Sequence, residues 1–546
     1  MGKVALIKKK NICSKRLNGV RMRDFHFPGR SSVLAENGMC ATSHPLAAQA
    51  ALEILKNGGN AMDAAIAGAV LLGICEPQMT GIGGDCFVLF SPSGSNEIKS
   101  MNGSGYAPSL ANADELRDEA LSSIPLNSAH AVTIPCAIDA FCKLSADWGK
   151  LGLDTILQPA IHYAEHGVPI AERVAYDLAE LTENLNPAGR EFYLPWGRAP
   201  KVGELFAHPG QVKVLNEIAK KGRDGFYSGE VAEDMVNSLQ KLGGTHTMDD
   251  FSNMEAFYTN PIAGKFSKFE LVEHPPNGQG ATAILLCNIL KHFPISSMEP
   301  FGFERTHIET EATKLAYDAR NRLVSDPTVF DATTRMTSDK LAEELADKIN
   351  MKQVINEVSS VTEEVHKDTI YITVVDKDQM AVSLIYSIFH GFGSGIASEK
   401  FGVLFQNRGA GFNLIPGHVN EYGAHKRPLH TIIPAIIKEN GIVNMPFGVM
   451  GGQYQAAGHA RVLSNIYDYE MDIQAALDAP RSFFENGSLR IERGYDKDTV
   501  EKLSNLGHEI DQKIGPIGGA QAIKIHDSGV LEGASDPRKD GCALGY

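Results

Sequence analysis

The stretch Asp-Thr-Ile-Tyr-Ile-Thr-Val-Val-Asp, residues 368–376, decides how this chain is interpreted. A charged run at residues 363–368 leads to Thr369, and the β-branched residues that follow are typical of a strand that begins at a hydroxyl residue. A cut between Asp368 and Thr369 would expose an N-terminal threonine. Such a residue carries a nucleophile and its own base, because an α-amine with a pKa of about 7.7–8.0 can accept the hydroxyl proton. Asp368 and Thr369 are therefore a candidate cleavage site, and Thr369 is a candidate nucleophile.

The residues after Thr369 predict a β-hairpin, because a polar, turn-like interruption at 376–379 separates two apolar runs. If Asp378 is the centre of the hairpin, Ser387 lies opposite Thr369 with the two β-carbons about 5 Å apart. A second hydroxyl would then lie beside the first. A register slip of one residue would place a neighbour of Ser387 there instead, and the sequence leaves this alternative open.

The composition sets the class of protein. The chain has 546 residues, 43% of them hydrophobic, which suffices for several ordinary domains or one large layered domain. Its 51 basic and 66 acidic residues give a net charge of −15, which argues against nucleic acid or an anionic membrane as a partner. The longest apolar run, residues 64–75, is shorter than the roughly 20 residues of a membrane span and predicts a buried helix.

The N-terminal region carries several lysines, but no sustained apolar segment follows them. No secretory signal is predicted, and we expect a cytoplasmic protein. Residues 1–37 are expected to be an N-terminal extension, partly disordered, and Met22 is an alternative start of the chain. Eight cysteines are scattered without CxxC pairs, so neither a zinc site nor a disulfide framework is predicted. We expect no metal and no organic cofactor.

Local patterns predict helices in the first part of the chain and short strands after Thr369. Ser43-His44-Pro45 is typical of a helix start, with Gly58-Gly59 as its end, and a second, Ala-rich helix is expected from Asn60. The glycine-rich residues 80–85 precede a strand instead of linking a strand to a helix, so they do not match a phosphate-binding loop. Further elements are expected as helices at 305–324, 340–358, 473–477 and 498–506 and as strands at 86–90 and 269–272. The charged residues 340–368 are the best candidate boundary.

Six short motifs follow one another along the chain, and their order is more specific than any one of them. They are Asp368-Thr369, Val374-Val375-Asp376, Phe392-Gly393-Ser394-Gly395, Lys426-Arg427-Pro428-Leu429, Gly451-Gly452 and Asp478-Ala479-Pro480-Arg481. In this order they resemble the γ-glutamyltranspeptidase family of N-terminal-nucleophile hydrolases. The resemblance covers about residue 38 to the C-terminus.

The resemblance implies an α/β fold of four layers, αββα, made as an inactive precursor. The precursor would cut itself before Thr369 into a large chain, 38–368 with its extension, and a small chain, 369–546, which remain together as one domain. Thr369 would form an acyl-enzyme, and Ser387 would occupy the position of a supporting threonine. The N–H groups of Gly451 and Gly452 would hold the oxyanion. Glycines allow the close backbone approach that this needs, and loss of one such donor typically costs about 3–4 kcal/mol.

Several positions depart from the family pattern, among them His430-Thr431, where the family has paired serines, and Phe389, where it has an asparagine. Family members that act on γ-glutamyl compounds hold the substrate's amino-acid end with an arginine and an aspartate, and these positions are Ser104 and Gly411 here. Charge-assisted hydrogen bonds contribute roughly 1.5–3 kcal/mol each, so glutathione is disfavoured as a substrate. The segment 412–426, where transpeptidases carry a lid, is short, and hydrolysis is therefore expected to exceed transfer.

The candidate substrate-binding residues are Ser104, His390, Arg408, His430 and Thr431. Residues 406–409 together with His430-Thr431 resemble the branch of the family that contains oxamate amidohydrolase and the cephalosporin acylases. Our hypothesis is that Arg408 binds a carboxylate next to the scissile amide, and the alternative is a structural arginine paired with a nearby acid. Neither histidine is needed for proton transfer, because the α-amine supplies the base, and each is equally explained as a hydrogen-bonded structural residue.

The sequence thus favours a self-cleaving amidohydrolase for a small carboxylated amide. Its partners would be this small molecule and the two chains of one precursor, and a homodimer is compatible with the sequence. Two alternatives stay open. One is a glutathione hydrolase or γ-glutamyltransferase with a rearranged substrate clamp. The other is an uncleaved, inactive member that acts as a binding protein.

Overall fold

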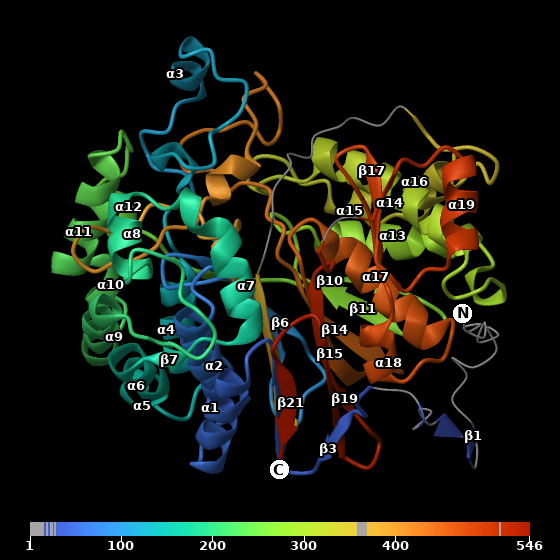
Figure 1. The fold of residues 1–546 in the computed structure, drawn as a ribbon, viewed down its shortest axis with the longest axis horizontal. Helices are drawn as coiled ribbons and strands as arrows, with labels where there is room; N and C mark the ends of the chain where they lie inside the picture. The colour runs from blue at the N-terminus through green and yellow to red at the C-terminus, as the bar shows by residue number, and fades with distance from the viewer. Residues whose placement is uncertain (1–15, 18–19, 22–25, 27–28, 357–368, 513–514) are drawn as a thin grey trace, which may run out of the picture.

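The computed structural model describes residues 16–17, 20–21, 26, 29–356, 369–512 and 515–546. Two seven-stranded sheets, each antiparallel throughout, lie face to face, and helices cover the outer face of each (Figure 1). The architecture is therefore the four-layer αββα sandwich that the motifs predicted. No helix in the described part of the chain is both long enough and apolar enough to cross a membrane.

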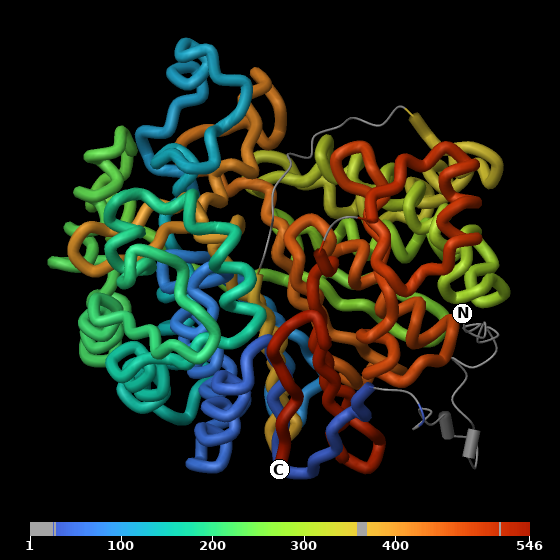
Figure 2. Tube along the Cα trace, in the orientation of Figure 1, coloured from blue at the N-terminus to red at the C-terminus, as the bar shows by residue number. Residues whose placement is uncertain are grey.

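The first sheet contains the strand that follows Thr369. Its strands, in spatial order, are β21 (Cys542–Gly545), β4 (Gly38–Thr42), β12 (Ile370–Asp376), β13 (Ala381–Ser387), β5 (Asp85–Ser91), β6 (Lys99–Gly103) and β9 (Phe257–Thr259). Strands from both ends of the sequence thus lie in one sheet. Figure 2 shows these N-terminal (blue), middle (gold) and C-terminal (red) segments side by side.

The second sheet packs on the first. Its strands, in spatial order, are β10 (Ile262–Lys265), β11 (Glu270–Glu273), β14 (Pro434–Glu439), β15 (Ile442–Met450), β19 (Gly519–Ile525), β20 (Leu531–Ser535) and β3 (Val33–Ala35). Smaller pairings join β1 (Arg16–Leu17) to β2 (Val20–Arg21), β7 (Val168–Pro169) to β8 (Leu205–Phe206), and β16 (Ser482–Glu485) to β17 (Ser488–Ile491) and β18 (Ile510–Asp511).

Helices of the first half of the chain lie on the side of the first sheet. They are α1 (Pro45–Lys56), α2 (Ala61–Cys75), α3 (Ala113–Asp118), α4 (Ala137–Trp148), α5 (Leu153–Ile156), α6 (Gln158–His166), α7 (Glu172–Leu181), α8 (Pro187–Tyr193), α9 (Pro209–Lys221), α10 (Asp224–Tyr227), α11 (Gly229–Gln240) and α12 (Met248–Ser252). Every residue of α2 is buried, as the apolar run predicted, and α2 packs directly on β12 and β13. Its first turn is closed by a capping box between Asn60 and Asp63.

The other helices lie on the side of the second sheet, where α13 and α17 pack on its strands. They are α13 (Gly280–Leu290), α14 (Phe303–Leu323), α15 (Thr333–Met336), α16 (Asp339–Ala346), α17 (Tyr454–Tyr467), α18 (Ile473–Asp478) and α19 (Lys497–Asn505). Short 3₁₀ turns occur at η1 (Ala129–Ala131), η2 (Thr182–Asn184), η3 (Ile295–Ser297) and η4 (Arg408–Gly411).

The layer between the two sheets is apolar. It is filled by side chains that project from the facing strands, among them Met39, Leu89, Val375, Ile436 and Ile523, all of them buried. Because both faces of β12 and β13 are covered, all residues of these two strands are buried, including their hydroxyl residues. The hairpin that follows Thr369 is thus held rigidly from both sides.

One expectation about an element boundary was wrong. The helix expected at 340–358 is α16, which ends at Ala346, and the described residues after it, to 356, are not helical. The extension expected at residues 1–37 includes β3, whose residues pair with β20 at the edge of the second sheet. A two- or three-residue edge strand carries too little periodicity to be recognised from sequence.

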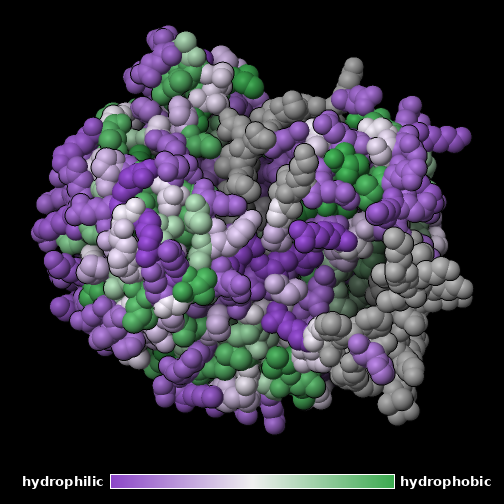
Figure 3. Space-filling model, viewed as in Figure 1, coloured by the Kyte–Doolittle hydropathy of each residue, from purple (hydrophilic) through white to green (hydrophobic). Residues whose placement is uncertain are grey.

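Hydrophilic residues predominate on the face drawn in Figure 3, and its apolar residues lie in separate groups. This pattern agrees with the net charge of −15. This face therefore shows no broad apolar patch.

Candidate active site

Thr369 lies directly before β12, and its hydroxyl is hydrogen-bonded to that of Ser387, with the two oxygens 3.1 Å apart. The hairpin has the register that Asp378 as its centre predicted, since Ile370 pairs with Tyr386 and Val375 with Ala381. Both side chains are buried, and Ser387 Oγ also accepts a hydrogen bond from Phe389 N at 2.9 Å. The second hydroxyl is therefore fixed before any substrate binds.

The glycine-rich stretch before β5 lies against the end of β13. Ser387 pairs with Asp85, and a Cβ atom added at Gly84 would lie 2.4 Å from Ser387 O. Only glycine fits at this distance. The glycine-rich residues 80–85 therefore allow the backbone to pass close to Ser387.

Gly451 and Gly452 form the turn between β15 and α17. Their φ angles are +119° and +55°, both in the region that favours glycine. Gly451 O accepts a hydrogen bond from Tyr454 N at 3.0 Å, so the first turn of α17 begins at this point. The positive end of the helix dipole therefore lies at the turn, where it favours negative charge.

The buried side chain of Gln279 connects this turn with Thr431. Its Nε2 donates hydrogen bonds to Thr431 O at 2.6 Å and to Gly452 O at 3.2 Å. Gln279 precedes α13, far from both partners in sequence. It thereby ties a segment before Thr369 to two loops that follow Thr369 in the sequence.

Arg408 lies in η4 with its side chain fully buried. Its Nη1 donates to Thr431 Oγ1 at 3.0 Å, and its guanidinium carbon lies 4.1 Å from the centre of the Phe389 ring. Its Nε and Nη2 have no hydrogen-bond partner in the described part of the chain. Burial lowers the pKa of Arg408 to about 9, so the group is still cationic at neutral pH.

Asp85 is the acid nearest to this arginine among the described residues, with Arg408 Nε 3.9 Å from Asp85 Oδ2. Burial raises the pKa of Asp85 to about 7, although the Arg408 charge acts in the opposite direction. His430 Nε2 lies 3.2 Å from the same carboxylate oxygen. Burial also lowers the pKa of His430 well below its usual range, so this histidine is neutral and donates to Asp85.

The remaining predicted substrate-binding residues have partners within the protein. Asn407 Nδ2 donates to His390 Nδ1 at 2.8 Å, and the His390 ring stacks on Phe389. Ser104 Oγ donates to Asn102 Oδ1 at 2.7 Å and is buried. The structure therefore brings His390, Arg408 and Thr431 together around Phe389 and Ser387, whereas the hydroxyl of Ser104 is engaged in an internal network.

Sequence reasoning assigned no site role to Asp85, Gln279, Phe389 and Asn407. Phe389 has a φ of +80°, which is strained for a large side chain, and strain of this kind is common at functional sites. The glycine pair before Asp85 was a usable signal for close backbone contact. Asn407 stood within the pattern of residues 406–409, but nothing there gave it a role of its own. Gln279 carries no signal in a single sequence, because an isolated amide is common anywhere in a chain.

Asp368, the other half of the predicted cleavage site, lies outside the described residues. Beyond the site, one group of potential metal ligands occurs in the described part: His307, Glu311 and His508, whose ligand atoms lie within 4.8 Å of one another. His307 Nδ1 and His508 Nε2 are hydrogen-bonded at 2.7 Å, and Lys314 Nζ pairs with Glu311 at 2.8 Å. We therefore assign this group to a hydrogen-bonded network.

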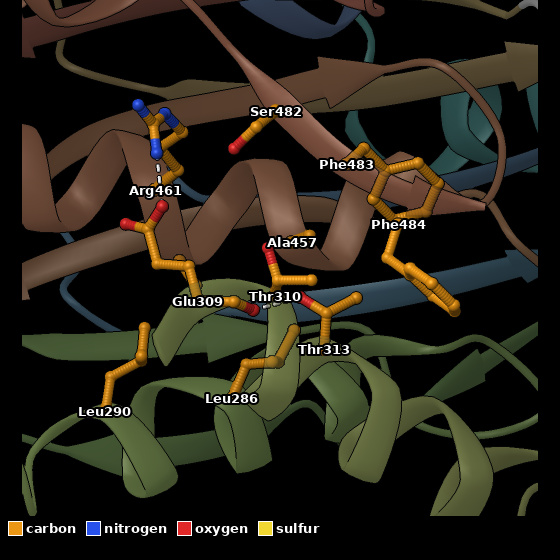
Figure 4. A pocket seen from close by; sticks show the side chains of 11 residues that line it. Leu286, Leu290, Glu309, Thr310, Thr313, Ala457, Arg461, Ser482, Phe483 and Phe484 are labelled. Atoms are coloured by element: carbon orange, nitrogen blue, oxygen red, sulfur yellow. Dashed lines mark hydrogen bonds and ion pairs between the residues drawn. The ribbon is translucent and has the colours of Figure 1, made fainter. Parts of the chain in front are cut away.

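A cavity between α13, α14, α17 and β16 contains none of the site residues (Figure 4). Leucine and phenylalanine side chains line it, and an ion pair between Glu309 and Arg461 lies at one side. Arg461 is a buried arginine on the helix that follows the Gly451-Gly452 turn, and its Nη2 donates to Pro480 O and Tyr495 Oη.

Three comparisons, with a family model, with known protein sequences and with solved structures, agree on one family. The family model described as gamma-glutamyltranspeptidase matches residues 47–546. A glutathione hydrolase-like YwrD proenzyme of Bacillus subtilis is 34% identical, covering 94% of this chain and 99% of that protein. An oxamate amidohydrolase proenzyme of Klebsiella pneumoniae is 31% identical, and the match covers 94% of this chain and 100% of that protein. The crystal structure of a cephalosporin acylase from Bacillus halodurans superposes with a TM-score of 0.88 at 35% identity, covering 96% of this chain and 99% of that one.

Proposed function

Because the chain belongs to the γ-glutamyltranspeptidase family and is thus an amide-bond hydrolase, we propose that Thr369 is the nucleophile with which it cleaves a small, carboxylated amide. The precursor cleaves itself between Asp368 and Thr369, which frees the α-amine of Thr369. The proposal rests first on the hydrogen bond between Thr369 and Ser387, which holds the nucleophile in place.

The reaction proceeds in two steps, formation of an acyl-enzyme and its hydrolysis. The α-amine of Thr369 accepts the proton of its own hydroxyl, and Oγ1 attacks the amide carbonyl carbon. The N–H groups of Gly451 and Gly452 hold the oxyanion, the C–N bond breaks, and the amine leaves with the proton. Water then attacks the resulting ester with the same amine as base, which releases the acid and restores the hydroxyl.

The substrate class follows from Arg408. This guanidinium is fully buried and is held by Thr431 and Phe389. Its Nε and Nη2 have no hydrogen-bond partner among the described residues, and Nε lies 3.9 Å from Asp85 Oδ2. A buried cation with unused donors is suited to an anion, and a carboxylate beside the amide would meet both nitrogens. Oxamate is the smallest compound of this class, and its hydrolysis would give oxalate and ammonia.

The test compares oxamate with oxamide, its uncharged analogue, using cleaved wild-type protein and the variants Arg408→Ala and Arg408→Lys. Loss of a charge-assisted pair worth roughly 1.5–3 kcal/mol should lower kcat/KM for oxamate about 10- to 100-fold in Arg408→Ala. Hydrolysis of oxamide should change much less. Oxamate turnover that survives in Arg408→Ala would refute the substrate assignment and leave the nucleophile untouched.

The second candidate is a γ-glutamyl hydrolase or transferase, because a relative that is 34% identical bears the name glutathione hydrolase-like. The positions expected to hold the γ-glutamyl amino and carboxylate groups are Gly411 and Ser104, neither of which is charged. Turnover of γ-glutamyl-p-nitroanilide, with and without glycylglycine as acceptor, distinguishes the two. We expect slow turnover and no stimulation by the acceptor.

We also place the protein in the cytoplasm. The seven cysteines in the described part of the chain are unpaired, and five of them are buried. Reduced, buried thiols are typical of a reducing compartment. Cell fractionation with an antibody against the small chain tests this location.

A further inference from the structure

We propose that Arg320, which no step of the chemistry uses, is a positioning residue that holds the oxyanion turn Gly451-Gly452 in its active shape. The inference rests on the proposed function, because it assumes that this turn binds the oxyanion. It concerns a residue of the large-chain segment that acts on the small-chain segment through two glutamines.

Arg320 lies on α14 and is buried, with 1% of its surface exposed. Its Nη1 donates to Gln279 Oε1 at 2.8 Å and also to Gln453 Oε1. Its Nε and Nη2 donate to Asn321 Oδ1, at 3.1 and 2.8 Å. Burial lowers the pKa of Arg320 to about 10, so the group is charged at neutral pH. Within the described residues, no carboxylate lies within salt-bridge distance of it.

The guanidinium determines which way each glutamine amide points. Arginine has only donors, so the atom of an amide that faces it must be the oxygen. Gln279 Oε1 therefore faces Arg320, and Gln279 Nε2 must face the other way, where it donates to Gly452 O and Thr431 O. The two carbonyl groups favour the same orientation, because they only accept hydrogen bonds and an amide oxygen turned toward them would lose both. Arg320 therefore reinforces an orientation in which Gln279 is bonded at both ends of its amide.

Gln453 is held in the same manner from the other side of the turn. Its side-chain oxygen accepts from Arg320, and its backbone oxygen accepts from Tyr317 Oη. The Arg320 guanidinium also lies 4.3 Å from the centre of the Tyr317 ring. The peptide that follows Gly452 is thus fixed by Gln279 before it and by Gln453 after it, and Arg320 connects the two.

A buried positive charge behind the turn adds an electrostatic effect. The N-terminus of α17 already favours negative charge at Gly451-Gly452, and Arg320 lies on the same side. No carboxylate among the described residues neutralises the charge of Arg320. The positive potential of this guanidinium therefore acts on the turn, to which Gln279 and Gln453 connect it. A developing oxyanion would gain from both sources, and an uncharged substrate in the ground state would gain little.

The test uses Arg320→Met and Arg320→Lys, with Arg461→Met as a matched control for the loss of a buried arginine. Self-cleavage is checked first by mass. We expect Arg320→Met to lower kcat on the substrate that the wild type hydrolyses by about 10- to 100-fold, less than the loss of a direct donor, with KM changed less than threefold. Arg320→Lys should restore part of kcat. Arg461→Met should reduce the melting temperature and leave kcat near that of the wild type.

A double variant tests the route through Gln279. If Arg320 acts by orienting this amide, Arg320→Met and Gln279→Leu together should cost no more in kcat than the more harmful single change. Additive losses would overturn the route through Gln279, and a kcat in Arg320→Met equal to that of Arg461→Met would overturn the proposal as a whole.

A failure of the proposed function would be recognised separately. If the wild type hydrolyses none of the amides, the same variants are compared by the burst of p-nitrophenolate from p-nitrophenyl acetate, an activated ester that needs the nucleophile and the turn only. A slower burst in Arg320→Met than in Arg461→Met supports the positioning role, and equal bursts refute it.

Discussion

The hydroxyl oxygens of Thr369 and Ser387 lie 3.1 Å apart, although the residues are 18 positions apart in sequence. The hairpin between them brings them together, and its register is fixed by a polar turn in which Asp376 Oδ1 accepts hydrogen bonds from Asp378 N and Met380 N, each at 3.0 Å. The pair therefore exists before cleavage and does not depend on the new N-terminus.

Removal of the second hydroxyl should slow the reaction without preventing folding. In Ser387→Ala, Thr369 Oγ1 loses its partner and Phe389 N loses its acceptor. Since each such bond contributes about 1 kcal/mol, we expect kcat to fall about 5- to 30-fold. Ser387→Thr keeps the hydroxyl and should retain most activity. Initial rates on fully cleaved protein measure both, and equal activity in Ser387→Ala and wild type would contradict the role.

The close approach of Gly84 to Ser387 predicts a large effect of one methyl group. A Cβ atom at Gly84 would lie 2.4 Å from Ser387 O, so Gly84→Ala must displace β13 at its catalytic end. Overpacking of this kind typically costs about 1–3 kcal/mol, and kcat should fall at least tenfold because Ser387 moves.

Gly81→Ala is the matched control for this change. A Cβ atom there meets nothing within 4 Å, and the residue belongs to the same stretch. We expect its melting temperature and kcat to remain near those of the wild type. If kcat and the melting temperature fall by similar amounts in the two variants, the effect comes from any added methyl group in residues 80–85 and not from the contact with Ser387.

The buried carboxyl group of Asp85 predicts a pH dependence of stability. Its folded pKa is about 7, whereas an unfolded aspartate titrates near ~3.9, so the folded protein binds the extra proton between these values. The contribution to stability is therefore present below about pH 4 and is lost as the pH rises through about 7. Over this range the loss is at most about 4 kcal/mol.

Asp85→Asn should flatten this dependence, because an amide does not titrate. The measurement is the urea midpoint from pH 5 to 8 in a Thr369→Ala background, which we expect to stay uncut. Burial also raises the pKa of Glu76 to about 7, so some slope should remain in Asp85→Asn and should diminish further when Glu76→Gln is added. If Asp85→Asn does not change the dependence of the urea midpoint on pH, Asp85 must have the same pKa in the folded and the unfolded protein.

Much of the fold could be predicted because its signals are local. The hairpin register followed from one polar turn, and α1 and α2 followed from helix-start residues and glycines. The helix expected at 340–358 failed after Ala346, because a charged, amphipathic pattern can continue beyond the point where tertiary contacts end the helix.

The contacts within the site were harder to predict, because they join distant segments. Arg408 was identified as a substrate-binding candidate, but its neighbour Asp85 comes from a strand more than three hundred residues earlier. Gln279, directly before α13, and Arg320, on α14, reach the glycine turn from segments more than 130 residues earlier in the sequence. No local pattern encodes such pairs, since the sheet order that brings them together is fixed only by the whole fold.

The central claim, that Thr369 becomes an N-terminal nucleophile by self-cleavage, is tested most directly by intact mass under denaturing conditions for wild type and Thr369→Ala. The account predicts two fragments in the wild type, divided between Asp368 and Thr369, and one full-length chain in the variant. A single uncut chain in both, or the same two fragments in Thr369→Ala, would contradict it.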